Sequence, residues 1–420
     1  VYKRQDFFTD PRLARVIQTA LDNNRDLRIA LANVEQARAQ YRVQRADLLP
    51  AVGVNGSATY QDQPFAQQSS GGTGGVSGRT DIYTASVGVS AWEVDLFGRV
   101  RNLTKAAQES YFASVENRNA AQTALIAETA TAWLTMAADQ ERLQIARNLE
   151  KAFGQTLDLT KARFSKGIAS ELEVRQAQTS YDQARSDIAA ATTQVAQDKN
   201  ALDLLAGTSL GAEDLPSNLP ETDVTLANLP AELPSSLLLR RPDIAAAEHQ
   251  LIGANANIGA ARAAFFPTIS LTAAFGTMSL GLSNLFKSGS DYWSLAPSAS
   301  LPIFDFGKNQ GNLRYARATY DAMVATYEKS VQTGFREVAD ALARRATMSA
   351  QLEAQTSLRN AARKSYQLSD ARFKAGVDDF LTALDSQRTL YNAEQTLVAT
   401  RLTRASNMVE IYRAIGGGLK

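Results

Sequence analysis

The sequence predicts an α+β fold in which a tandem repeat supplies long antiparallel coiled-coil helices and four β-strands. Three observations predict it. The two halves of the chain match each other, apolar residues recur at sevens along extended helical stretches, and four segments alternate between apolar and small polar side chains. The 420 residues are 45% hydrophobic and 21% charged, which indicates a folded chain with ample core material.

The two halves of the chain repeat the same motifs in the same order. The pattern Ala-Arg-Phe-x-x-Gly occurs at residues 162–167 and again at 371–376, and Leu-Leu-Pro at 48–50 matches Phe-Phe-Pro at 265–267. An internal duplication explains this spacing. A stretch with four prolines joins the copies and is a poor helix former. The expected domains are therefore repeat one (1–207), a connector (208–236) and repeat two (237–420).

Each repeat should contain a medium helix, two strands, a very long helix, a tight turn and a second medium helix. Helix-favouring composition and the absence of proline within the long segments predict the helices, and alternation predicts the strands. For repeat one we expect helices at 11–48, 100–164 and 171–206 with strands near 51–60 and 82–92. For repeat two we expect helices within 243–264, at 308–373 and at 380–415, with strands near 268–276 and 292–301.

The helices carry a coiled-coil pattern. At 1.5 Å per residue each long helix would extend roughly 100 Å, which only equally elongated partners could cover. Two medium helices stacked end to end, such as 11–48 and 171–206, match that length. Apolar residues at strict sevens mark the seam, namely Val174, Tyr181, Ile188, Val195 and Leu202 in repeat one and Leu384, Tyr391, Val398, Ala405 and Tyr412 in repeat two.

The four strands have one apolar face and one small, hydroxyl-rich face without charges. A soluble half-buried sheet, the alternative, would normally carry Lys, Glu or Arg on its outer face, so the pattern favours a transmembrane barrel with a wet interior. Trp92 lies out of phase, and we expect its strand to have ended there. The residues predicted to face lipid are Val52, Val54, Val87, Val89, Ile269, Leu271, Phe275 and Leu295.

Four strands cannot form a barrel alone, because open sheet edges do not occur in hydrocarbon. Other copies of the chain must therefore complete it. Two copies would give eight strands, a barrel filled by its own side chains, whereas three would give twelve strands and leave a lumen. The small residues of the inner face favour the trimer.

The composition excludes most kinds of catalytic and metal-binding chemistry. The chain has no cysteine, and its single histidine, His249, is expected to be a surface or interhelix residue, so thiol chemistry and zinc or iron–sulfur centres are not expected. A formal net charge of +1 argues against nucleic-acid binding. No phosphate-binding or nucleophile motif occurs, and no run of 18 apolar residues suggests a transmembrane helix. We expect no enzymatic activity, no metal and no cofactor.

Taken together, these motifs resemble the TolC-like outer-membrane factors, and within that family the OprM-type channels of tripartite multidrug (RND) efflux pumps. The resemblance covers nearly the whole chain. It rests on Asn-Arg-Asp-Leu at 24–27, Ala-Asp-Leu-Leu-Pro at 46–50, Trp-Glu-Val-Asp-Leu-Phe-Gly-Arg at 92–99, Arg-Arg-Pro-Asp-Ile at 240–244, Phe-Phe-Pro at 265–267, Leu-Asp-Ser-Gln-Arg at 384–388 and both Ala-Arg-Phe-x-x-Gly turns.

The resemblance implies a homotrimer in the outer membrane that extends into the periplasm, with a twelve-stranded barrel above a helical tunnel. It also implies a mixed equatorial belt built from the connector and the chain ends. It implies an exit duct for drugs and other small amphipathic compounds, and hence a part in antibiotic resistance, coupled to a periplasmic adaptor (membrane fusion) protein and an inner-membrane RND transporter. Two alternatives stay open: a type I protein secretion channel and a coiled-coil spacer anchored in the outer membrane. Members of this branch often carry a lipid-bearing N-terminal Cys, so a lipoprotein anchor upstream of Val1 is a further open expectation.

Two sets of residues are expected to act at the hairpin turns. The two turns bring similar apolar and basic groups together, so the first set should dock the adaptor: Phe164, Gly167, Ile168, Phe373, Gly376 and Val377. Both glycines should also cap their helices, and the alternative is that both phenylalanines only close the coiled coil.

The second set follows from the resemblance, which places the tip of repeat two at the centre of the pore. It implies an apolar constriction at Leu381 and an acidic ring at Asp385. Arg372 precedes the turn, and we expect it to hold the tip shut by pairing with Asp378 or Asp379. The alternatives are that Leu381 is a core residue and that Asp385 is a solvated surface charge.

Overall fold

The computed structural model describes residues 7–62, 79–220 and 240–417. The chain divides into two compact units, and each long helix contributes residues to both. Unit 1 comprises Val1–Ala32, Glu116–Ala245 and Glu328–Lys420, and unit 2 comprises Asn33–Val115 and Ala246–Tyr327. Most of the predicted connector, including Pro230 and Pro234, lies outside the described residues.

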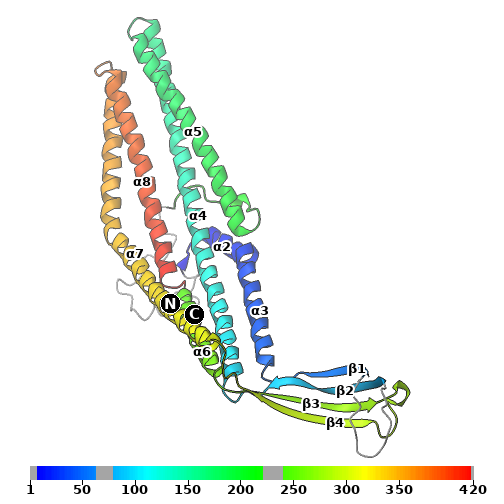
Figure 1. Cartoon of the computed structure of the whole chain (residues 1–420). Helices are drawn as coiled ribbons and strands as arrows, with labels where there is room; N and C mark the ends of the chain where they lie inside the picture. The colour runs from blue at the N-terminus through cyan, green and yellow to red at the C-terminus, as the bar shows by residue number, and fades with distance from the viewer. Residues whose placement is uncertain (1–6, 63–78, 221–239, 418–420) are drawn as a thin grey trace, which may run out of the picture. The chain divides into compact units, whose positions relative to one another are not determined.

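The helices and strands follow the predicted order in both copies of the repeat (Figure 1). Repeat one contains α2 (Pro11–Asn23), α3 (Arg25–Ala46), β1 (Val52–Asp62), β2 (Arg79–Glu93), α4 (Arg99–Ser165) and α5 (Glu171–Ala206), and the short 3₁₀ turn η1 (Ala212–Asp214) follows. Repeat two contains α6 (Pro242–Ala263), β3 (Thr268–Ser279), the 3₁₀ turn η3 (Leu282–Asn284), β4 (Asp291–Ser300), α7 (Lys308–Lys374) and α8 (Phe380–Ala414). No described helix is long and apolar enough to cross a membrane.

The helix expected over residues 11–48 is two helices, so that prediction was wrong at one position. The chain turns at Asn24, whose backbone is extended between α2 and α3. The Asn24 side chain explains the break, because its Oδ1 accepts a hydrogen bond from the Leu27 amide at 2.9 Å and so starts the second helix.

The junction at Asn24 also joins α5 to this helix pair, as end-to-end stacking requires. Asn24 Nδ2 donates to the Leu205 carbonyl near the end of α5 at 3.0 Å. In repeat two, Arg241 Nη1 donates to the Ala414 carbonyl near the end of α8 at 2.9 Å. The two acceptors are the same position of the repeat, so the duplication preserves this contact even though its donor changed from an amide to a guanidinium.

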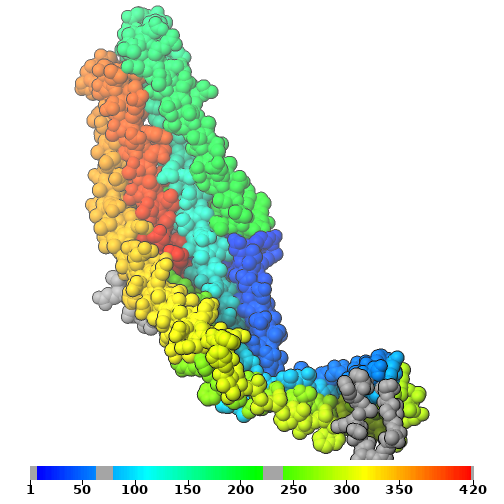
Figure 2. Space-filling view, viewed as in Figure 1, coloured from blue at the N-terminus to red at the C-terminus, as the bar shows by residue number. Residues whose placement is uncertain are grey.

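The main core of unit 1 lies on one side of α4. Trp133 and Tyr412 are fully buried there with Phe7 and Leu13 of the N-terminal segment. Trp133 Nε1 donates to the Asp214 carbonyl of η1 at 3.0 Å, so the start of the connector covers the same side. Figure 2 shows α8, in orange to red, lying against both α7 and α4. Farther along, Ala177 and Ala184 are buried between the hairpins.

Unit 2 contains one antiparallel sheet in the order β1-β2-β3-β4. Sequential strands pair throughout, which leaves β1 and β4 as the edges of the described sheet. Trp92 corrects the sequence analysis: β2 does not end before it. A bulge between Val89 and Trp92, with Ala91 at φ 50°, shifts the register so that Trp92 lies opposite Leu271. The extra residue of a β-bulge returns the side chain to the apolar face.

Candidate functional site

The two hairpin turns share one backbone geometry. Gly167 and Gly376 have φ of 71° and 76°, the left-handed region that glycine enters without steric cost. Gly167 N–H donates to the Phe164 carbonyl at 2.9 Å, and Gly376 N–H to the Phe373 carbonyl at 3.0 Å. The next amide in each turn closes a second bond to a carbonyl five residues back, at 2.9 Å in both. This Schellman pattern confirms both glycines as helix caps.

The side chains on the two turns differ. Phe164, Ile168 and Val377 are exposed, and the half-exposed ring of Phe164 leaves an apolar surface at the first turn. Phe373, the equivalent of Phe164, is only 3% exposed. Five of the six residues predicted to dock an adaptor therefore lie within reach of a partner, and Phe373 instead closes the end of the coiled coil.

Phe373 joins the two hairpins. Its ring packs edge-on against Phe380 at 5.9 Å between centroids, and the Arg163 guanidinium lies 5.0 Å from its centroid. Phe153 and Leu157 of α4 belong to the same buried cluster. Sequence reasoning found neither partner, because Arg163 lies on the other hairpin and Phe380 lies across the turn from Phe373, and no periodic pattern links such positions.

The predicted gate residues lie on the exposed side of α8. Leu381 is 53% exposed and Asp385 is also exposed, one helical turn later on the same face. Leu381 is therefore not part of the core of the single chain. The arrangement presents one apolar and one acidic side chain to whatever lies beyond this helix.

Arg372 pairs with one of its two predicted partners. Its Nε and Nη2 donate to the two Asp378 oxygens, each at 2.7 Å. These hydrogen bonds lower the pKa of the Asp378 carboxyl. Asp379 instead accepts from the Thr382 amide at 2.8 Å and caps α8, and the hydrogen bonds from Thr382 lower the pKa of Asp379. The second turn is thus held by a bidentate ion pair that the first turn lacks.

Strand pairing aligns the predicted lipid-facing residues in rows across the sheet. One row runs Val54, Val87, Phe275 and Trp293, and the next runs Val52, Val89, Ala273 and Leu295. Ile269 and Leu271 continue the same face toward the helices. On the opposite face hydroxyls pair across strands, with Ser57 and Thr84 oxygens 2.6 Å apart and Ser270 and Ser298 oxygens 2.8 Å apart.

No residue of the four described strands is buried. A sheet with an exposed apolar face, a hydroxyl-rich face and two free edges needs lipid on one side, water on the other and more strands at its edges. Joined to two antiparallel coiled-coil hairpins, it defines the subunit of an outer-membrane channel.

Comparison with known proteins agrees with this class. The family model described as "Outer membrane efflux protein" matches residues 16–208 and 233–417. The antibiotic efflux pump outer membrane protein ArpC of Pseudomonas putida is 46% identical over 414 residues, covering 99% of this chain and 84% of ArpC. The toluene efflux pump outer membrane protein TtgC of the same species has the same identity and coverage. The crystal structure of the open state of the Neisseria gonorrhoeae MtrE channel superposes with a TM-score of 0.88 at 39% identity, covering 100% of this chain and 92% of MtrE.

The chain belongs to the outer membrane efflux protein family. It is the outer-membrane exit duct of an efflux pump, located in the outer membrane and extending into the periplasm. Its fold combines long antiparallel coiled-coil helices with a transmembrane β-barrel of twelve strands, four from each chain of a trimer.

Proposed function

We propose that the two hairpin tips dock a periplasmic adaptor protein and that the tip of repeat two gates the duct. The proposal rests on one observation: the two turns have the same backbone geometry but carry different side chains. Twin turns offer a repeating docking surface, six per trimer, through Phe164, Ile168 and Val377. The adaptor links the duct to an inner-membrane RND transporter, which supplies the energy, while the duct conducts drugs and small amphipathic compounds passively.

In this proposal the gate is built from Leu381, Asp385 and Arg372. Three symmetry-related Leu381 side chains around a narrow pore would exclude water, and three Asp385 carboxylates would favour cations over anions. The Arg372–Asp378 pair stiffens the turn that precedes them. The exposure of Leu381 and Asp385 on one face of α8 supports this role.

A glycine substitution tests the docking surface. Space around Gly167 and Gly376 is open, so a charged side chain would project outward, at a cost of roughly 1 kcal/mol for the left-handed backbone. Gly376→Asp should abolish efflux in cells while the trimer still inserts in the outer membrane. Gly289→Asp is the matched control, because Gly289 also has positive φ and open space but lies in the β3–β4 loop. Normal efflux by Gly376→Asp would contradict the proposed docking.

The apolar rows of the sheet are proposed to face lipid. Trp293 lies in one of these rows and is 75% exposed, whereas Trp133 is fully buried in unit 1. In a Trp92→Phe background, reconstitution in bilayers with brominated acyl chains should therefore quench Trp293 emission and leave Trp133 emission unchanged. Equal quenching after the further change Trp293→Phe would contradict this placement.

The chain is proposed to act as a duct without catalytic activity. Its single histidine, its lack of cysteine and its membership of an efflux family support this. Deletion in cells separates the function from its alternatives: rising drug sensitivity supports efflux, loss of an exported protein supports type I secretion, and an envelope defect alone supports a spacer. Turnover of any substrate by the purified chain would contradict the absence of catalysis.

A further inference from the structure

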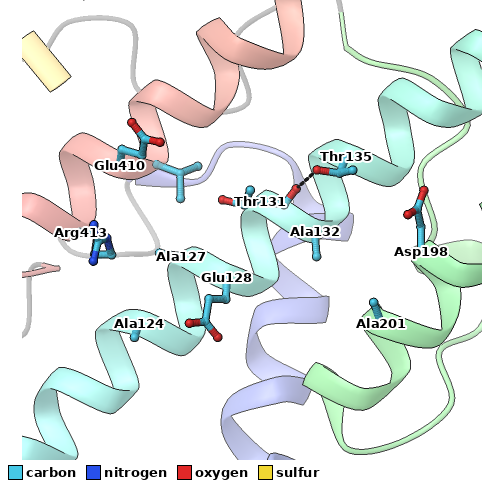
Figure 3. Close-up of a pocket in the computed structure, with 11 residues that line it drawn as sticks. Ala124, Ala127, Glu128, Thr131, Ala132, Thr135, Asp198, Ala201, Glu410 and Arg413 are labelled. Carbon is cyan, nitrogen blue, oxygen red and sulfur yellow. Dashed lines mark hydrogen bonds between the residues drawn. The ribbon is translucent and has the colours of Figure 1, made fainter. Parts of the chain in front are cut away.

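Unit 1 contains a cavity of about 480 Å³ bounded by α4, α5 and α8. Figure 3 shows Glu128 and Thr131 on α4 between Glu410 and Arg413 of α8 and Asp198 and Ala201 of α5. Alanines form much of the remaining wall, so the cavity is largely apolar with a few charged groups. Its size falls within the range of about 300–1,000 Å³ typical of small-molecule sites.

The charges in this cavity do not balance. Glu410 is paired with Arg344 at 2.5 Å, and Arg413 with Glu337 at 3.2 Å, so these two lining residues are neutralised. Glu128 forms no hydrogen bond or ion pair with any described residue. The cavity therefore carries at least one carboxylate without a positive partner.

Asp198 adds a second acidic group to the wall of the cavity. It is 9% exposed and lines the cavity. Gln194 Nε2 donates to its Oδ1 at 2.9 Å, whereas its buried Oδ2 receives no hydrogen bond from the described residues. That oxygen is closed off from the cavity and the carboxyl interacts with Asp139, so Asp198 adds negative charge to the wall without offering an accessible acceptor. The cavity thus favours a ligand with a positive charge.

The cavity lies beside the main core of unit 1, because Ala127 and Val409 belong both to its wall and to that core, and its wall includes the face of α4 that carries Glu128 and Thr131. Trp133 faces that core with the N-terminal segment and η1, and Thr131 and Thr135 project from the opposite face of the helix.

We propose that this cavity binds amphipathic organic cations, with Glu128 facing the positive charge, Asp198 adding negative charge to the wall and the alanines facing the apolar body. The inference rests on the proposed passage of amphipathic compounds and deepens it, because it names the cationic ones. Three such sites in a trimer would raise the local concentration of cationic cargo along the exit path.

Ethidium, a planar organic cation, is the probe. Anisotropy titrations would use the purified trimer in a neutral detergent, with uncharged N-phenyl-1-naphthylamine as the second ligand. Glu128→Gln should weaken ethidium binding about fivefold, as expected for removing one partly exposed charge. It should leave binding of the uncharged dye unchanged. Asp158→Asn is the matched control, because Asp158 is also an exposed acid on α4 but lies outside the cavity.

A steric variant tests the location of the site. Ala201→Trp places a large ring at an exposed lining position of α5 and should abolish ethidium binding, whereas Ala196→Trp, exposed on the same helix outside the cavity, should not. Equal ethidium affinity in the wild type, Glu128→Gln and Ala201→Trp would overturn the proposal. Conductance in planar bilayers separates this failure from that of the duct itself, because a channel that conducts normally without binding ethidium loses only the site.

Discussion

The turn at Gly167 and the turn at Gly376 share a backbone and differ in what their side chains do. In the first, Phe164 stays half exposed and Arg163 reaches across to the Phe373 ring. In the second, Phe373 is buried against Phe380 and Arg372 binds Asp378 through two hydrogen bonds. The repeat-one position equivalent to Asp378 is Ala169, so the first turn has no such pair. Duplication thus preserved the glycine cap, while the two equivalent phenylalanines differ: Phe164 adds apolar surface to the first turn, and Phe373 is buried at the second.

Replacing each phenylalanine by alanine should give the largest difference between the two turns. Phe373→Ala deletes a buried ring and should destabilise the tip by about 3 kcal/mol. That corresponds to a rise of roughly a hundredfold in hydrogen exchange of the amides at 374–380. Phe164→Ala is the control and should change exchange at the first turn little, because its ring is half exposed. Similar acceleration in both variants would show that the tips are packed alike.

A buried acid gives a second contrast between repeats. Asp198 of repeat one corresponds to Asn407 of repeat two, which is 2% exposed and donates to the Ala341 carbonyl at 3.1 Å. Burial, and then the negative charge of Asp139, raises the pKa of Asp198. Arg142, which pairs with Asp139, and Gln194 also lie close to it, and Glu128, Glu410 and Arg413 share the cavity wall with it. The stability this carboxyl contributes when protonated is therefore lost as pH rises from its ordinary pKa of 3.8 through the raised value.

Asp198→Asn should consequently raise the thermal unfolding temperature of the trimer at neutral pH, by the equivalent of about 1 kcal/mol. The gain should shrink toward zero as pH falls to the ordinary Asp range. Asp203→Asn on the same helix is the control, and it should lower the unfolding temperature at neutral pH. Burial raises the pKa of Asp203, but hydrogen bonds from Lys199 and Leu210 outweigh this effect and lower it. A neutral-pH loss of stability in Asp198→Asn would contradict this account.

The Arg372–Asp378 pair should have the smallest effect on stability. Both groups are near the surface of the turn, where water and salt screen their attraction, so a double-mutant cycle with Arg372→Gln and Asp378→Asn should give only a weak coupling that added salt removes. Because Arg372 lowers the pKa of Asp378, this coupling should persist at neutral pH and disappear only in acid, as pH falls through that lowered value. Arg163→Gln with Ala169→Asn in repeat one should show no coupling. A larger coupling there than in repeat two would overturn the assigned difference.

Local sequence patterns predicted the helices and strands, but they did not predict the contacts between segments that are far apart in the sequence. Heptads and alternation anticipated the long helices and the apolar face of the sheet. Trp92 was misread because the bulge at Ala91 depends on pairing with β3, and the break at Asn24 depends on an amide that also binds α5. Likewise, nothing within residues 371–376 distinguishes Phe373 from Phe164. The difference arises from Phe380 and from Arg163 on the other hairpin, which only tertiary packing brings together.

The cavity at Glu128 was likewise not predicted from the sequence. Its acids come from three helices far apart in sequence, and each alone reads as a solvated charge. Its unbalanced charge becomes visible only when the partners of Glu410 and Arg413 are known. Sequence spacing therefore predicts single helix faces well and composite sites poorly.

Single-channel conductance tests the central claim, that the tip of repeat two and not that of repeat one gates the duct. The residues equivalent to Leu381 and Asp385 in repeat one are Leu172 and Gln176, and Leu172 is exposed as Leu381 is. In planar bilayers, Leu381→Ala with Asp385→Ala should raise the open-channel current and weaken cation preference, whereas Leu172→Ala with Gln176→Ala should leave both as in the wild type. Unchanged current and selectivity in the Leu381 and Asp385 double variant would place the constriction elsewhere.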